Sequence, residues 1–165
     1  MLLCAECIDN LNWLSQIFKI QTAERSMLIV NDIQQGFDMK LKYTIMYVED
    51  VKTTLEFYRD AFGFEIELLH PSGDYGALNT GETTLSFSSL ALMNQLGKGA
   101  VKPQPSAPTF EIAFETEQVA EQLQQALAAG AKLVQDVEEM PWGQTTAYVH
   151  DINGYLVEIC SPVSV

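Results

Sequence analysis

The stretch KYTIMYVEDVKTTLEFYRDAFG, residues 42–63, gives the clearest indication of the fold. Its first half is rich in β-branched and aromatic residues, which is typical of a strand, and an acidic turn follows. Asp50 is placed to cap a helix after that turn, and Gly63 is placed to end it. Between them, apolar residues recur at helical spacing, namely Val51, Leu55, Tyr58 and Phe62. The stretch therefore predicts a strand, a turn and an amphipathic helix.

The same pattern returns in TFEIAFETEQVAEQLQQALAAG, residues 109–130. Val119 takes the place of Val51 at the start of the apolar stripe. We expect Thr116 to cap this second helix and Gly130 to stop it. The chain therefore contains two related halves rather than a longer repeat array.

Three strand-like runs follow each helix, separated by Gly-, Pro- and Asp-containing turns. They are FEIELLH (64–70), YGALNT (75–80), TTLSFSS (83–89), AKLVQDV (131–137), QTTAYVH (144–150) and YLVEICS (155–161). The predicted class is α+β, with two βαβββ modules over 39–96 and 107–165 that form a cupped mixed sheet. One helix covers one face of each half, so the other face must be covered by something else or must enclose something.

Residues 1–38 differ from the repeated part and are predicted to be a helical N-terminal extension. Apolar residues in this segment fall at helical spacing, at Ile8, Leu11, Leu14 and Phe18. We expect the extension to pack on the domain or on a second subunit. Two alternatives stay open, which are an interaction module and upstream sequence without a dedicated function.

The composition limits the classes of partner. The chain of 165 residues has a formal net charge of −13, which disfavours nucleic acid and an anionic membrane surface. It contains no apolar run of about 18 residues that would span a bilayer. Lys19 is the first basic residue, so we do not expect the charged start of a secretory signal in this segment. We expect a cytoplasmic protein.

Residues 39–165 resemble the glyoxalase/bleomycin-resistance/extradiol-dioxygenase family, the vicinal oxygen chelate superfamily. YTIMYVEDVKTTLEFYRDAFGFE (43–65) and PWGQTTAYVHDINGYLVEICSPV (141–163) carry the resemblance. The resemblance implies a cupped sheet around a ligand cavity and a homodimer. Its motifs are specific for the fold and do not specify the reaction.

Metal-dependent members of that family place ligands on the first and last strand of each half. The resemblance carries these positions to Tyr43, Ser86, Glu111 and Glu158. The second half keeps two carboxylates, whereas the first half has a phenol and a hydroxyl. A catalytic zinc site normally has three protein ligands, so this set favours no cofactor, with a divalent metal on Glu111 and Glu158 as the alternative.

Two acids stand in strands that otherwise read as buried. Glu111 shares its face with Thr109 and Ala113, and Glu158 shares its face with Leu156. We expect both carboxylates to be buried and to converge on the concave side, with Glu111 as the polar anchor. Burial without a partner is costly, so a metal, a cationic or hydrogen-bonding ligand, or nearby hydroxyl groups should pair with them.

Aromatic residues are expected to border the same trough, as in many small-molecule pockets. The expected ligand-binding residues are Tyr43, Tyr75, Ser86, Phe87, Glu111, Trp142, Tyr148 and Glu158. The sequence predicts a protein that binds a small organic ligand, cationic or aromatic in character. The alternative is a metal-dependent lyase, isomerase or dioxygenase. The sequence does not identify the ligand, and it leaves enzyme activity open.

Overall fold

The structure is a computed structural model that describes residues 39–163. The chain divides into two compact units, Met1–Lys40 and Leu41–Val165. The second unit contains the two repeated halves and is described here. The expected N-terminal extension over 1–38 lies outside the described residues.

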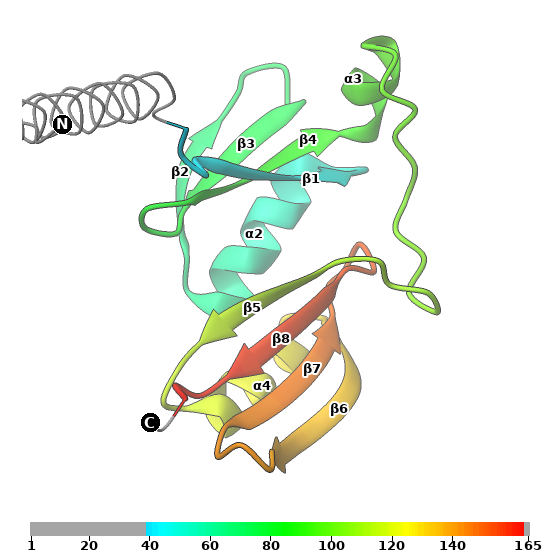
Figure 1. Ribbon diagram of the computed structural model, residues 1–165. Coiled ribbons are helices and arrows are strands. Elements are labelled where there is room, and N and C mark those ends of the chain that lie inside the picture. The colour runs from blue at the N-terminus through cyan, green and yellow to red at the C-terminus, as the bar shows by residue number, and fades with distance from the viewer. Residues whose placement is uncertain (1–38, 164–165) are drawn as a thin grey trace, which may run out of the picture. The chain divides into compact units, whose positions relative to one another are not determined.

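The first module contains one helix and a four-stranded sheet with the strand order β1-β4-β3-β2 (Figure 1). Its β1 and β4 are parallel, and the other neighbours are antiparallel. The elements are β1 (Tyr43–Val48), α2 (Val51–Phe62), β2 (Glu65–Leu69), β3 (Tyr75–Asn79) and β4 (Thr84–Ser89).

The second module repeats this topology with the strand order β5-β8-β7-β6. The elements are β5 (Glu111–Glu115), α4 (Val119–Ala128), β6 (Lys132–Glu139), β7 (Thr145–His150) and β8 (Leu156–Cys160). The predicted α+β class with two βαβββ modules is confirmed. The strands form two separate four-stranded sheets, with β1 and β5 at the end of each.

The caps of the two helices differ. Asp50 caps α2 as predicted, accepting a hydrogen bond from the Thr53 amide at 2.7 Å, and Gly63 ends it at φ 76°. The prediction that Thr116 caps α4 is wrong, because Gln118 occupies the N-cap and makes no side-chain bond to the helix. The Thr116 hydroxyl instead accepts from the amide of Gln118 at 3.1 Å and shapes the preceding turn.

A short helix, α3 (Leu90–Gln95), was not predicted. The Ser89 side chain caps it by accepting from the Leu92 amide. Its six residues are too few for an apolar stripe at helical spacing to repeat, so the sequence did not indicate a helix here.

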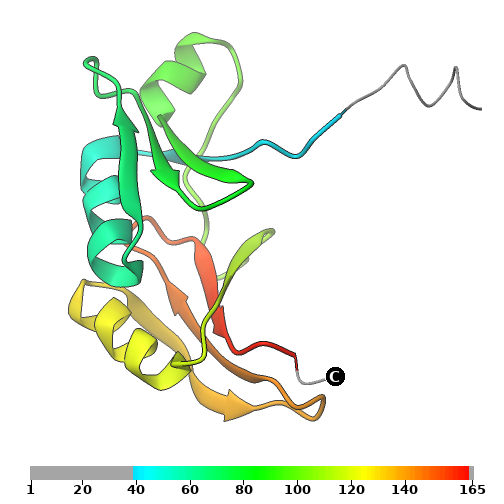
Figure 2. The same cartoon turned by 90° about the vertical axis from the view of Figure 1, so that its left-hand side faces the viewer.

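Both long helices cover the same side of the molecule, and the strands lie on the other side (Figure 2). Tyr58 of α2 is fully buried and packs against Phe87 with ring centroids 5.0 Å apart. In the second module, Leu123 of α4 and Val149 of β7 belong to the same buried core. Each sheet therefore has one face covered by a helix and one uncovered face.

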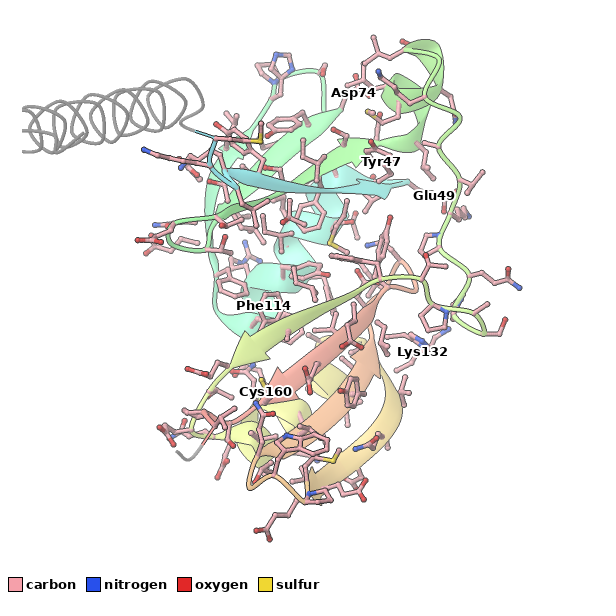
Figure 3. The ribbon with its side chains drawn as sticks, viewed as in Figure 1. Tyr47, Glu49, Asp74, Phe114, Lys132 and Cys160 are labelled. Atoms are coloured by element: carbon pink, nitrogen blue, oxygen red, sulfur yellow. The ribbon has the colours of Figure 1, made fainter. Side chains whose placement is uncertain are left out.

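Polar contacts join the two modules on the helix side. The side chains of Gln122 and Gln125 on α4 donate to the last turn of α2, at the carbonyls of Ala61 and Asp60. Lys102 of the connecting segment pairs with Glu49 at 2.7 Å, and Figure 3 shows Glu49 beyond the end of β1, close to this segment. The two glutamine contacts hold α4 against α2 while leaving the strand faces uncovered.

Candidate functional site

The uncovered face of the second sheet carries most of the predicted polar residues. Cross-strand partners in a sheet share a face, so the register assigns side chains to it. Three rows cross β5, β8, β7 and β6 in that order, namely Glu111–Leu156–His150–Lys132, Ala113–Glu158–Tyr148–Gln135 and Glu115–Cys160–Thr146–Glu138.

Glu158 and Tyr148 form a hydrogen-bonded pair in the middle row. The Tyr148 hydroxyl donates to Oε1 of Glu158 at 2.8 Å, and both residues are half-buried. Burial raises the pKa of Tyr148, and the bond to Glu158 and the charges of Glu158 and Glu111 raise it further. The phenol therefore stays protonated at neutral pH, which fixes it as a donor to the carboxylate.

Glu111 lies on this face as expected, but the prediction that it is buried is wrong. Its residue is exposed, and no hydrogen bond or ion pair of its side chain is recorded within residues 39–163. The reason is that β5 is an end strand, so β8 is its only neighbour among the described strands. Glu111 and Glu158 share the face, but their registers differ by two residues, which separates their Cα atoms by roughly 8 Å.

Glu111 also lines a hollow of about 360 Å³ at the start of β5. Its other lining residues are Pro108, Thr109, Phe110 and Leu156. Phe110 is 51% exposed, so an aromatic ring and a carboxylate are both accessible there. Leu156 precedes Glu158 by two residues on the same strand face, so the hollow adjoins the Tyr148–Glu158 pair.

Two further polar groups on this face lack partners. Thr146 is fully buried, and its hydroxyl makes no hydrogen bond within the described residues. The side-chain nitrogen of Gln135 is also buried and also makes no hydrogen bond within the described residues. A buried polar group without a partner is costly, so both groups point to a bound water that would pair with them. The sequence did not single out Gln135. The pairing of β6 with β7 is irregular on both sides of this residue, so simple alternation along β6 does not predict which face Gln135 takes.

The first module contributes less to a site than expected. Tyr43 lies on the uncovered face and is 53% exposed. Ser86 lies on the same face but is fully buried, and its hydroxyl accepts from Tyr75 at 2.9 Å. The Ser86 hydroxyl is therefore occupied by a protein partner, whereas Tyr75 is half-buried and Tyr43 presents an accessible ring.

The placement of Phe87 on the trough is wrong. Its register partners are Met46 and Gly76, and its ring is fully buried against Tyr58 of α2. Because side chains alternate along β4, Ser86 and Phe87 cannot face the same side. Trp142 lies in the turn before β7, is 59% exposed and donates to Gln144 at 3.0 Å.

The four positions implied for a metal do not fit one in this chain. Ser86 is buried and already bonded, Tyr43 offers a phenol, and Glu158 accepts from Tyr148. Within the described part of the chain, no three His, Cys, Asp or Glu residues are grouped in a way that would hold a metal ion.

Cys160 lies in the row beside Thr146 and is buried. Burial raises the pKa of its thiol, and the charges of Glu158 and Glu115 raise it further. The thiol is therefore protonated at neutral pH and is a poor nucleophile.

The chain matches a known protein family over most of its length. A family model described as a glyoxalase-like domain matches residues 41–164. No curated protein matches the sequence. Among residues 39–163, no helix has the length and apolar character needed to cross a bilayer.

Solved structures with the same fold are numerous. One is a glyoxalase/bleomycin resistance protein/dioxygenase family enzyme from Burkholderia phytofirmans PsJN, with 22% identity, a TM-score of 0.67, and coverage of 76% of this chain and 100% of that chain. A glyoxalase/bleomycin resistance protein/dioxygenase from Nocardioides has 16% identity and a TM-score of 0.68, covering 85% and 94%. A glyoxalase-related enzyme from Fulvimarina pelagi has 19% identity and a TM-score of 0.66, covering 75% and 88%. At these identities the likeness establishes the fold.

Proposed function

Because this chain belongs to the glyoxalase-like domain family, we propose that it binds a small organic molecule on the uncovered face of its second sheet. Glu158, held by Tyr148, is the polar anchor of this site. The observation that carries the proposal is this half-buried carboxylate–phenol pair on the sheet face that no helix covers. A ligand above the middle row would contact the Glu158 carboxylate directly, because Glu158 and Tyr148 are only half-buried.

The charge of the face favours a cationic ligand. Four carboxylates project from it, and Lys132 and His150 are its basic residues. A cation would gain charge-assisted hydrogen bonds from Glu158 and would be attracted by Glu111. The exposed ring of Phe110 beside Glu111 also suits a planar aromatic group.

We further propose that the protein is a homodimer in which a second copy covers the uncovered faces. Tyr43 and Ile45 on β1 are 53% and 46% exposed, which is unusual for neighbouring apolar residues of a strand. Covering them would turn the shallow site into an enclosed one. Tyr75 and Trp142 would then border the ligand.

The ligand proposal is tested with proflavine, a planar aromatic cation, titrated against the purified protein by fluorescence. Glu158→Gln removes the charge and keeps the shape of the side chain. It should weaken binding about 10- to 100-fold, because a hydrogen bond to a charged group contributes about 1.5–3 kcal/mol. Tyr148→Phe should weaken binding by a smaller factor, since it only frees the carboxylate to move.

The matched control is Glu121→Gln, which removes a carboxylate from the exposed surface of α4. Equal affinity for all three variants and the original protein would refute the site. Stoichiometric metal in the purified protein, lost in Glu158→Gln but not in Glu121→Gln, would instead favour the metal-dependent lyase, isomerase or dioxygenase alternative.

A further inference from the structure

Within residues 39–163, no strand pairs with the backbone groups on the outer edge of β5. The Thr116 amide donates to the Cys160 carbonyl, so at this position the backbone of the β5 segment points toward β8. Backbone direction alternates along a strand, so the N–H and C=O groups of Glu111, Ala113 and Glu115 point away from β8. β5 is the end strand of its sheet, so these groups form an open edge.

The edge of β1 shows what such groups bind in this fold. The Thr84 amide donates to the Lys42 carbonyl, so the backbone of residue 42 points toward β4. By the same alternation, the backbone N–H and C=O groups of Tyr47 point away from β4. Here a side chain takes the place of a strand, because the Tyr155 hydroxyl accepts from the Tyr47 amide at 3.2 Å and donates to its carbonyl at 2.8 Å. No equivalent side chain meets the edge of β5 within residues 39–163.

A cavity of about 440 Å³ runs along the open edge of β5. Four consecutive residues, 112–115, line it. Consecutive side chains of a strand point to opposite faces, so all four can border one cavity only along the backbone edge. Leu41, Thr44 and Leu85 of the first module form the opposite wall.

The two sides of this edge differ in chemistry. On the helix side, Ile112 and Phe114 are half-buried, and Phe114 packs on Phe62 of α2 with centroids 5.0 Å apart (Figure 3). On the uncovered side, Ala113 is flanked along the strand by the exposed carboxylates of Glu111 and Glu115. A strand added here would place alternate side chains against an apolar wall and beside two negative charges.

We propose that this edge is a docking site for an extended peptide segment of another protein, added to β5 as a further strand. The preferred segment alternates apolar and basic residues, because the apolar side chains face Ile112 and Phe114 and the basic ones face Glu111 and Glu115. Its backbone pairs with the outward groups of β5, which is how peptides join exposed sheet edges. With five residues, β5 offers about 17 Å of edge.

The probe is a labelled peptide, acetyl-Lys-Val-Lys-Val-Lys-amide, measured by fluorescence anisotropy against the full chain; in register with β5, its valines lie opposite Ile112 and Phe114 and its outer lysines opposite Glu111 and Glu115. Ala113→Pro removes an outward N–H and leaves the β5–β8 pairing intact, because proline is tolerated where the N–H of an edge strand faces solvent. It should weaken binding about tenfold, whereas Ala113→Gly, which keeps the N–H, should bind within about threefold of the original protein. Glu115→Lys should weaken the binding of this peptide and strengthen the binding of the Glu-Val-Glu-Val-Glu analogue.

A second measurement guards against misfolding of Ala113→Pro. The same peptide, N-methylated at the residue opposite Ala113, cannot make the backbone bond and should bind the original protein about tenfold more weakly. Equal binding of the Lys and Glu peptides, or no effect of N-methylation, would overturn the proposal. It would also be overturned if Ala113→Pro dissociated the protein into monomers while neither peptide bound, since the occupant would then be a second copy.

Discussion

Asp151 is a buried carboxylate at the junction of the two modules. It accepts hydrogen bonds from the amides of Asn153 and Tyr155 at 2.9 and 2.8 Å and from the Tyr58 hydroxyl at 3.1 Å. Burial raises its pKa, and these bonds offset part of that effect. From the sequence, Asp151 could be recognised only as part of a turn. The residues around it do not show that the Tyr58 hydroxyl, 93 residues away in the chain, donates to its carboxylate.

The raised pKa predicts a pH dependence of stability. A carboxyl whose folded pKa exceeds its unfolded value contributes most below the unfolded pKa, and this contribution falls as pH rises through the folded pKa. The free energy of unfolding of the original protein, minus that of Asp151→Asn, should therefore decrease from pH 4 upward. Urea unfolding at several pH values measures it. An increase over the same range would show that the hydrogen bonds outweigh burial.

The Tyr58 hydroxyl can be removed at the same junction. Tyr58→Phe leaves the ring packing intact and deprives Asp151 of one donor. We expect a loss of about 1–3 kcal/mol in unfolding free energy at pH 7, because the carboxylate is left buried with fewer partners. Chemical denaturation measures this, and the loss should shrink in acid, where Asp151 is protonated.

At the scale of elements, the two helices offer a matched pair of N-caps. Asp50 bonds to the amide of Thr53, and this bond lowers the pKa of its carboxyl. Asp50→Ala should cost about 1 kcal/mol at neutral pH. A lowered folded pKa means that the contribution is present above the unfolded value and is lost as pH falls through the folded pKa, so the variant and the original should converge below pH 4.

Gln118→Ala is the control for this comparison. Gln118 caps α4 without a side-chain bond, so its replacement should change the unfolding free energy by less than about 0.5 kcal/mol. Thermal unfolding, monitored by circular dichroism, measures the stability of both variants. Equal losses for the two variants would contradict the assigned roles of these caps.

At the scale of the whole molecule, the Tyr155 hydroxyl ties the second module to the edge of β1. It bonds to both the amide and the carbonyl of Tyr47. Tyr155→Phe should lower the free energy of unfolding by about 1–2 kcal/mol, because the backbone groups of Tyr47 lose their partner. Tyr43→Phe, at an exposed position, should be close to neutral. The Tm difference between the two variants, at equal protein concentration, tests this.

The order of the helices and strands could be predicted from the sequence, because helix and strand periodicity and Gly-containing turns are local properties. The repeat of the 42–63 pattern at 109–130 was enough to predict two βαβββ modules. It also predicted correctly that Glu111 and Glu158 lie on the face away from the helix, since alternation along a strand fixes that choice. These features require only the chemistry of neighbouring residues.

The tertiary structure decided burial and pairing. Glu111 is exposed because β5 lies at the end of its sheet, and Phe87 belongs to the helix-covered core because register, rather than composition, assigns its face. The pairing of Tyr148 with Glu158 and the isolation of Thr146 arise from strands brought together across the sheet. Such contacts depend on which strands become neighbours, a property of the folded chain that no local stretch of residues encodes.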